Sequence, residues 1–266
     1  MMKQTAGYQN VVLEPVDPAG VAIMRIMRPH TRNAINRATI EELEVRIGEL
    51  EARSDVRCLI VAAETETTFI AGGDLKDFAE LTTPEQGRAM GAQMQQVLHR
   101  LSVLPFPSIA AIGGNAYGGG CEVALACDLR VLAADAHLVF SQVRLGLTTG
   151  WGGGPRLVQM VGPAVAMRIL LTGESVSANE AWRLGLAAAV VPREQVAETA
   201  SELAHRIAAL PHESVAALKQ LIHRSVHLSL EDALVLENHL FGQRWGSAEH
   251  QAAVARFLTR KGLHES

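Results

Sequence analysis

The pattern of apolar and polar positions changes character along the chain. In the first two-thirds, short runs of branched apolar residues alternate with longer segments in which apolar residues recur every three or four positions. Runs of the first kind predict buried strands, and segments of the second kind predict amphipathic helices. The expected strands are 21–27, 58–63, 108–112, 129–133 and 137–140. Strands that alternate with helices indicate an α/β architecture.

Capping residues mark where several of the expected helices begin. Asn36 precedes a helical run of apolar positions and is the expected N-cap of that helix. Thr83 and Gln86 form a capping box, with a proline at the first helical position between them. A second capping box at 177–180 starts a helix that Gly185 closes.

The strand pattern stops after about residue 195. Helical segments follow, with breaks expected near Pro211, Ser229 and Gly246. We therefore expect an α/β core over residues 1–195 and a helical C-terminal region over residues 196–266. Apolar residues near the end of the chain have little sequence left to cover them, so this region should pack on the core or on a neighbouring subunit.

Composition and charge exclude several classes of protein. The chain has 266 residues, of which 48% are hydrophobic and 20% charged, as is usual for a soluble globular protein. Its formal net charge of −4 argues against a nucleic-acid-binding surface. No apolar run approaches the roughly 18 residues needed to span a bilayer, and the N-terminus lacks the apolar core of a secretory signal. These features predict a cytoplasmic protein that binds neither nucleic acid nor membrane.

The residues that most often bind metals show no metal-ligand pattern. Cys58, Cys121 and Cys127 lie in apolar segments without metal-ligand spacing, which predicts buried, reduced thiols. The ten histidines are scattered, and those of the helical end form no constellation. The sequence therefore predicts no metal site.

A glycine-rich turn, GGNAYGGGCEVAL at 113–125, joins an expected strand to an expected helix. Backbone N–H groups at the start of a helix lack intrahelical partners and carry partial positive charge. Without side chains around them, such groups can approach an oxyanion closely. Close packing of the helix on the strand explains the glycines equally well. A P-loop is excluded because no lysine follows at the required spacing.

Glu122 lies in the first turn of that helix and is followed by apolar residues. Burial disfavours the charged form of a carboxyl group and favours a role as general acid or base. The alternative is a solvent-facing charge that stabilises the helix terminus.

A second glycine turn, FIAGGDLKDF at 69–78, has the same organisation of strand, glycines and helix start. Two such turns could each present one N–H group to the same oxygen, which is how backbone amides form an oxyanion hole. Asp74 is interpreted first as the N-cap of the helix that follows.

These turns, together with other segments, resemble the crotonase superfamily, also called the enoyl-CoA hydratase/isomerase family. The segments that carry the resemblance, in order and spacing, are RNAIN at 32–36, FIAGGDLKDF at 69–78, GGNAYGGGCEVALACDLRVLAADA at 113–136, GLTTGWGGGPRLVQMVG at 146–162 and LTGESVSANEAWRLGLAAAVV at 171–191. The resemblance implies a spiral of ββα units, with a helical C-terminal region that assembles homotrimers or dimers of trimers. It also implies an acyl-CoA substrate and no separate cofactor, because coenzyme A is part of the substrate.

The resemblance also assigns roles to individual residues. The N–H groups of Gly73 and Gly119 would hold the thioester oxygen as it gains enolate charge, and Glu122 would be the catalytic acid and base. Residues expected to contact the substrate are Arg32, Ala34, Ala71, Asp74, Leu75, Gln142, Arg144 and Trp151. Trp151 is equally well interpreted as a core aromatic residue, and Arg32 as a solvated charge.

The segment FSQVRLGLTTGWGG at 140–153 departs from the hydratase pattern. Hydratases of this family usually carry a second glutamate here, in a Pro-Glu pair, and this chain has neither residue of that pair. The segment resembles the ethylmalonyl-CoA decarboxylase-like branch more than ordinary hydratases. Arg144 could bind a substrate carboxylate if it faced the pocket, although an arginine at such a position more often points to solvent.

The sequence therefore predicts a lyase that acts on an acyl-CoA thioester, with enoyl-CoA hydration as the first expectation. Decarboxylation of an ethylmalonyl- or methylmalonyl-type CoA is the alternative, since that reaction needs enolate stabilisation but no base. Double-bond isomerisation needs one group that removes and returns a proton. A non-catalytic relative that binds acyl-CoA or RNA is the alternative outside the enzymes.

Overall fold

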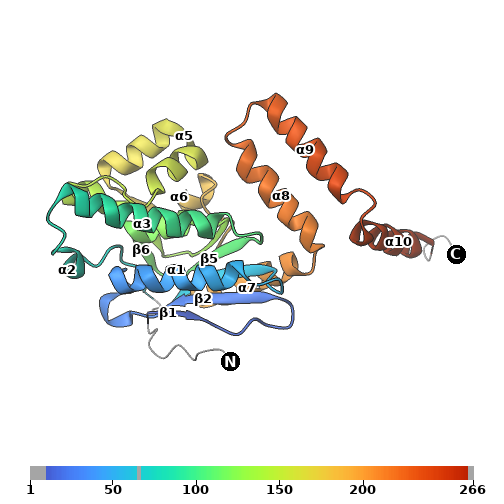
Figure 1. The fold of residues 1–266 in the computed structure, drawn as a ribbon. Coiled ribbons are helices and arrows are strands. Elements are labelled where there is room, and N and C mark those ends of the chain that lie inside the picture. Colours follow the sequence, from blue (N-terminus) through green and yellow to red (C-terminus); the bar gives the residue numbers. More distant parts are fainter. Residues whose placement is uncertain (1–9, 65–66, 263–266) are drawn as a thin grey trace. The chain divides into compact units, whose positions relative to one another are not determined.

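The computed structural model describes residues 10–64 and 67–262, and the chain divides into two units after Ala208 (Figure 1). Two sheets and the helices around them form the first unit. The described part of the second unit is helical. The α/β core and the helical C-terminal region expected from the sequence are both present.

The larger sheet accounts for the long apolar runs in the sequence. Its strands lie in the order β1-β2-β3-β5-β7-β10, and every neighbouring pair is parallel except β1 with β2. Parallel strands covered on both faces read as nearly continuous apolar runs. The strands of this sheet are β1 (Val11–Leu13), β2 (Val21–Ile26), β3 (Cys58–Ala63), β5 (Ser108–Ile112), β7 (Leu129–Ala133) and β10 (Ala189–Val191).

Each face of the larger sheet packs against its own helices. Leu59 belongs to the main core, which also holds apolar residues of α1 (Arg37–Glu51) and α3 (Pro84–Ser102). Its neighbour Cys58 belongs to a second core, which holds residues of α7 (Val196–Ala208). Successive side chains of a strand point to opposite faces, so one strand contributes to both cores.

Helix α7 sets the end of the first unit. Val196, Ala200 and Ala204 are buried in the second core against the sheet. The division therefore comes after Ala208, one helix later than the boundary at residue 195 that we expected from the sequence. Loss of the strand pattern marks the last strand, whereas the unit ends only after the last helix that covers the sheet.

A repeated strand–strand–helix arrangement builds the smaller sheet. In three successive repeats the first strand joins the larger sheet, as β3, β5 and β7 do, and the second strand joins the smaller one. The strands of the smaller sheet are β4 (Thr68–Ile70), β6 (Asn115–Tyr117), β8 (His137–Val139) and β9 (Ser175–Ser177). The pairs β4–β6 and β6–β8 are parallel, so the carboxyl ends of these three strands lie at one edge. The predicted α/β fold with repeated ββα units is confirmed.

Capping residues predicted from the sequence start several helices. Asn36 accepts a hydrogen bond in the first turn of α1, and Thr83 forms a reciprocal capping box with Gln86. Ser177 caps α6 (Ala178–Arg183). Other helices of the first unit are η1 (Pro29–Thr31), α2 (Leu75–Phe78), α4 (Gly119–Ala126), η2 (Ser141–Leu145), α5 (Gly153–Thr172) and η3 (Arg193–Gln195).

The second unit contains α8 (His212–Ser225), α9 (Leu230–Arg244) and α10 (Ala248–Gly262). Their breaks fall at the places expected from Pro211, Ser229 and Gly246. Helices α8 and α9 pack on each other. None of the described helices is long and apolar enough to cross a membrane. The three cysteines, all in the first unit, are buried and form no disulfide with one another, as expected.

Candidate active site

The candidate site lies at the carboxyl ends of three adjacent strands. Strand β4 leads to the turn that contains Gly73, β6 leads to Gly119 and Glu122, and β8 leads to Gln142. These residues are far apart in sequence but leave the same edge of one sheet. Ligands commonly bind at the carboxyl ends of parallel strands, where loops diverge from a rigid scaffold.

The backbone around Gly73 is fixed so that its own N–H group remains free. The N–H of Ile35 donates to the carbonyl oxygen of Gly72 at 2.8 Å, and the N–H of Asp74 donates to the carbonyl oxygen of Ile35 at 2.8 Å. These bonds form a parallel bridge between Ile35 and Gly73, and they use the backbone groups on either side of Gly73. Among the described residues, none accepts a hydrogen bond from the Gly73 N–H.

The N–H of Gly119 is free for a different reason. Gly119 is the first residue of α4, where an N–H group has no intrahelical acceptor. It too lacks an acceptor in the part of the chain that the structure describes. The two turns lie close together, because a methyl group placed on Gly72 would be 3.4 Å from the Gly119 nitrogen.

Trp151 forms a wall against both glycines. A methyl group on Gly119 would lie 2.1 Å from Cζ3 of the indole, and one on Gly73 would lie 3.6 Å from Cζ2. The ring is buried, at 5% exposed, and its Nε1–H donates to the sulfur of Met90 at 3.3 Å. The two interpretations of Trp151, core residue and pocket wall, are therefore compatible, since a buried ring packs directly against both turns.

The carboxylate of Glu122 is buried and held by four N–H donors. The residue is 2% exposed and lies in the first turn of α4. Its Oε2 accepts from the backbone N–H groups of Trp151 at 2.8 Å and Gly153 at 2.7 Å. Its Oε1 accepts from the Gln142 side chain at 2.9 Å and from the Gly150 N–H at 3.3 Å. The alternative interpretation of Glu122 as a solvent-facing charge is wrong.

The start of α5 is built around this carboxylate. A methyl group on Gly153 would lie 2.4 Å from Cγ of Glu122, so only glycine allows the helix to approach this closely. Gly152, the N-cap residue, has φ +93°, a conformation that favours glycine. The carboxylate therefore lies at the N-terminus of α5 as well as in the first turn of its own helix, and both helix dipoles favour its negative charge.

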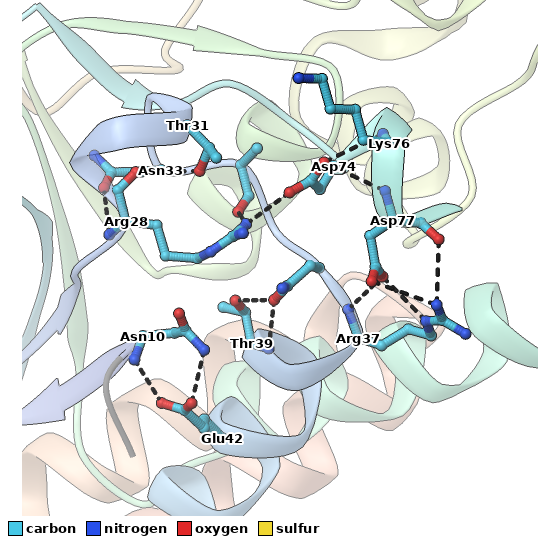
Figure 2. A network of polar contacts seen from close by, with 12 residues as sticks. Asn10, Arg28, Thr31, Asn33, Arg37, Thr39, Glu42, Asp74, Lys76 and Asp77 are labelled. Carbon is cyan, nitrogen blue, oxygen red and sulfur yellow. Dashed lines mark hydrogen bonds and ion pairs between the residues drawn. The ribbon is translucent and has the colours of Figure 1, made fainter. Parts of the chain in front are cut away.

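Asp74 holds the glycine turn at 69–78 in place. Its carboxylate caps α2 and forms an ion pair with Arg28 at 3.0 Å, as Figure 2 shows. The Arg28 side chain also donates to the carbonyl oxygen of Ala34. Burial opposes the charged form, but hydrogen bonds from Arg28 and the Asp77 N–H, with the charge of Arg28, hold the pKa of Asp74 below its usual value. The expectation that Asp74 is an N-cap is confirmed.

Asn33 ties the 28–36 loop to strand β4. Its side-chain Nδ2 donates to the carbonyl oxygens of Thr68 and Phe69, and the residue is fully buried with φ +58°. Sequence reasoning singled out neither Arg28 nor Asn33. No sequence signal distinguishes them, because each acts through contacts with residues about 35–46 positions away.

The remaining expected contact residues divide between the site and the surface. Arg32 has φ +54°, and its carbonyl oxygen accepts from the Ala71 N–H at 3.1 Å, so both lie where the two loops meet. Ala34 is buried beside them, and Leu75, the first residue of α2, is 60% exposed. These four residues border the turn that carries Gly73.

Arg144 does not join the Glu122 cluster. It is exposed, and its Nε would lie 3.2 Å from a methyl group on Gly173, the residue that ends α5. A different arginine, Arg156, is half-buried near Glu122 and donates from Nη1 to the carbonyl oxygen of Trp151 at 3.3 Å. Burial lowers the pKa of Arg156, and the charge of Glu122 acts in the opposite direction. Sequence reasoning did not single out Arg156.

Comparison with known proteins fits this geometry. Residues 17–264 match the family described as Enoyl-CoA hydratase/isomerase. The chain belongs to this family. It is 36% identical over 254 residues to the Short-chain-enoyl-CoA hydratase of Clostridium acetobutylicum, with 96% of each chain covered. It is 35% identical over 245 residues to the Ethylmalonyl-CoA decarboxylase of Xenopus laevis, covering 91% of this chain and 81% of that protein.

Solved structures of family members agree with the fold. The structure of an enoyl-CoA hydratase from Bacillus anthracis is 30% identical, with a TM-score of 0.90 over 95% of this chain and 97% of that one. One from Mycobacterium smegmatis has a TM-score of 0.90 at 29% identity, covering 94% of this chain and 96% of that one. The crotonase-like fold expected from the sequence is thus confirmed.

In the part of the chain that the structure describes, the Glu122 cluster contains a single carboxylate. Among the described residues, no other acidic side chain forms a hydrogen bond with Glu122 or Gln142. The described residues also contain no cluster of three or more histidine, cysteine or acidic side chains that could hold a metal ion. The cluster therefore offers one carboxyl group for acid–base chemistry.

Breaking the Arg28–Asp74 pair is expected to destabilise the protein. Both side chains are largely buried, at 8% and 13% exposed, so Asp74→Asn leaves the charge of Arg28 buried and uncompensated. We expect a loss of about 3 kcal/mol in the free energy of unfolding, measured by urea denaturation at pH 7. The matched control is Glu85→Gln, which breaks an exposed pair with Arg88 and should cost less than about 1 kcal/mol.

The same pair predicts a pH dependence. Because the folded pKa of Asp74 is lowered, its stabilisation is present above the unfolded value of about 3.9 and is lost as the pH falls through the folded value. The stability difference between wild type and Asp74→Asn should therefore shrink below about pH 4. A difference that stays constant down to pH 2 would contradict the assignment of the stabilisation to this pair.

Proposed function

We propose that this protein is an enoyl-CoA hydratase, a lyase that adds water across the double bond next to an acyl-CoA thioester. The observation that carries the proposal is the convergence of two free backbone amides and one buried carboxylate around Trp151. The hydratase relatives support this reaction, since they match over nearly the whole chain.

In this proposal the Gly73 and Gly119 amides donate to the thioester oxygen. Glu122 takes a proton from water while the water oxygen bonds to the β-carbon. The electron pair of the carbon–carbon double bond moves toward the thioester and places negative charge on its oxygen. Glu122 then returns the proton to the α-carbon, which yields a 3-hydroxyacyl-CoA. Each amide would lower the barrier by roughly 3 kcal/mol, because it faces the oxygen where charge develops.

The loops around the site are proposed to bind the coenzyme A portion of the substrate. Arg32, Ala34, Ala71 and Leu75 surround the turn that carries Gly73. Trp151 excludes water from the side of the two glycines. Under this proposal no separate cofactor is needed, since acid–base chemistry and backbone donors carry the reaction. We further propose that the protein acts in the cytoplasm.

Decarboxylation of a malonyl-type CoA is the second candidate. It is favoured by the single carboxylate and by the likeness to the Xenopus laevis decarboxylase. That reaction needs the same enolate stabilisation but no base to activate water. The expected cation, Arg144, is exposed and lies beside Gly173, which weakens this candidate.

Incubation with crotonyl-CoA and, separately, with ethylmalonyl-CoA distinguishes the candidates. Loss of enoyl absorbance with formation of 3-hydroxybutyryl-CoA is the expected result. Release of carbon dioxide from ethylmalonyl-CoA, without hydration of crotonyl-CoA, would replace the proposal with the decarboxylase. Tight binding of both thioesters with no product from either would indicate a non-catalytic relative.

We propose that the chain assembles as a homotrimer or a dimer of trimers. Support comes from large apolar side chains exposed on the second unit, among them Val235 at 71%, Trp245 at 66% and Phe257 at 60%. Size-exclusion chromatography with light scattering is expected to give three or six times the chain mass of 28.6 kDa. Val235→Glu should weaken the assembly, whereas Glu231→Gln, on the same helix, should not. A monomeric wild type at micromolar concentration would contradict the proposal.

A further inference from the structure

The side chain of Gln142 has one satisfied end and one unsatisfied end. Its Nε2 donates to Oε1 of Glu122 at 2.9 Å. Its Oε1 is buried and accepts no hydrogen bond from any described residue. Buried polar atoms nearly always have a partner, so an orphaned oxygen beside a catalytic carboxylate needs an explanation.

The orientation of the amide is fixed by the charge of Glu122. An ionised carboxylate only accepts hydrogen bonds, so the nitrogen of Gln142 must face it and the oxygen must face away. The orphaned oxygen is buried, and bulk water does not reach it. With Glu122 ionised, Gln142 therefore satisfies its neighbour and leaves its own oxygen unpaired.

The two oxygens of Glu122 differ in how firmly they are held. Oε2 accepts two short bonds, at 2.8 and 2.7 Å, from backbone N–H groups that cannot rotate. Oε1 accepts from a side chain at 2.9 Å and from a long backbone contact at 3.3 Å. A proton gained by the carboxylate therefore disturbs the fewest hydrogen bonds if it binds to Oε1. The donor that can move away from Oε1 is the Gln142 amide.

We infer that Gln142 is a positioning residue whose amide reverses each time Glu122 changes protonation. With Glu122 ionised, Nε2 donates to Oε1 of the carboxylate. With that oxygen protonated, the amide turns about its terminal bond, and Gln142 Oε1 accepts the new O–H. This terminal torsion is broad, so reversal displaces few neighbouring atoms.

This inference rests on the proposed function and extends it. The proton moves from water to Glu122 Oε1 and then to the α-carbon, and Gln142 neither gains nor loses one. Its amide stabilises both protonation states of a lone carboxyl group, which must act first as base and then as acid. A second carboxylate at this position would instead repel the ionised form of Glu122.

The test compares Gln142→Met and Gln142→Glu with wild type, using crotonyl-CoA hydration over a range of pH. Methionine fills a similar volume and makes no comparable hydrogen bond. For Gln142→Met we expect kcat to fall about tenfold or more with KM little changed, because the carboxyl group is less well oriented. The matched control is Gln159→Met, at an exposed position of α5.

Gln142→Glu is expected to change the pH dependence of activity. A neutral carboxyl group has one O–H donor and one carbonyl acceptor, so it replaces the amide at low pH. As the pH rises, the second carboxyl group ionises and repels Glu122, and activity should fall along a limb that wild type lacks. A Gln142→Glu enzyme as active as wild type, without that limb, would overturn the inference. So would a Gln142→Met enzyme with the wild-type kcat.

An infrared difference spectrum between low and high pH separates failure of this inference from failure of the proposed function. It needs no turnover, and Gln142→Met supplies the blank that assigns the amide carbonyl band of Gln142. The inference expects this band to move to lower frequency when Glu122 gains a proton, because the unpaired amide oxygen then accepts a hydrogen bond, and the change should be absent in Glu122→Gln. An amide carbonyl band that does not move would overturn the inference whether or not crotonyl-CoA is hydrated. Absence of wild-type turnover alone would contradict the proposed function.

Discussion

Replacing Glu122 with glutamine is expected to lower kcat for crotonyl-CoA hydration by about 10²- to 10⁴-fold, the usual contribution of a general acid–base group. In this site the loss should fall at the upper end, because the hydrogen-bond partners of Glu122 among the described residues include no second carboxyl group. KM should change little, since the proposed contacts to coenzyme A come from other loops. Steady-state kinetics at saturating substrate measure the effect.

Glu85→Gln provides the matched control for this prediction. It makes the same chemical change on the exposed surface of α3 and should retain full activity. The Glu122→Gln protein should also lose thermal stability, because the amide nitrogen that replaces Oε1 cannot accept from the Gly150 N–H, and because the charge favoured by the N-termini of α4 and α5 is lost. Activity within threefold of wild type would exclude Glu122 as the proton-transfer group.

The sequence predicts the larger sheet well, and the physical reason is burial. The run at 58–63 forms β3 with the expected bounds, as the run at 108–112 forms β5, because central parallel strands are apolar on both faces. Strands β4 and β6 have three residues each, too few to show any period, so the pattern predicts β8, at 137–140, but not the smaller sheet to which it belongs. Its existence follows only from pairing between distant segments.

The candidate site is predictable only in part, because some of its features are local in the sequence and others depend on contacts between distant residues. The glycine turns and Glu122 are local features, and the sequence locates them. Three of the four donors that hold Glu122 come from residues 28 to 31 positions later, just before and at the start of α5, and they depend on how that helix packs. The glycines of this segment are visible in the sequence. Nothing in the sequence indicates that they accommodate the carboxylate of Glu122. For Arg144, only the structure distinguishes between pocket and solvent.

The roles of Arg28 and Gln142 show a further limit of sequence reasoning. Arg28 follows a strand and looks like an ordinary surface charge, yet it is 7% exposed and pairs with Asp74 in the glycine turn at 69–78. Gln142 matters because one end of its amide is unpaired, which is a property of the folded site alone. Both residues act through a partner, and such residues carry no sequence motif of their own.

Alanine substitutions at three glycines are expected to fall in a definite order of severity. Gly119→Ala should be the most damaging, because the new methyl group would lie 2.1 Å from the buried indole of Trp151. Either the ring or the start of α4 must move, and the N–H of residue 119 moves with the helix. Misplacing one oxyanion donor costs about 10²- to 10³-fold in kcat. We expect a loss of that size, together with a lower Tm.

Gly73→Ala should be milder than Gly119→Ala, and Gly87→Ala should be harmless. At Gly73 the methyl group would lie 2.9 Å from a ring atom of Phe78, a half-buried side chain that has room to yield. At Gly87, in the exposed first part of α3, nothing lies within 4 Å, and alanine favours the helix by about 1 kcal/mol. Measuring kcat and Tm for all three variants tests the order. If Gly119→Ala kept wild-type kcat while losing stability, the amide of residue 119 would not be an oxyanion donor, and the clash with Trp151 would be purely structural.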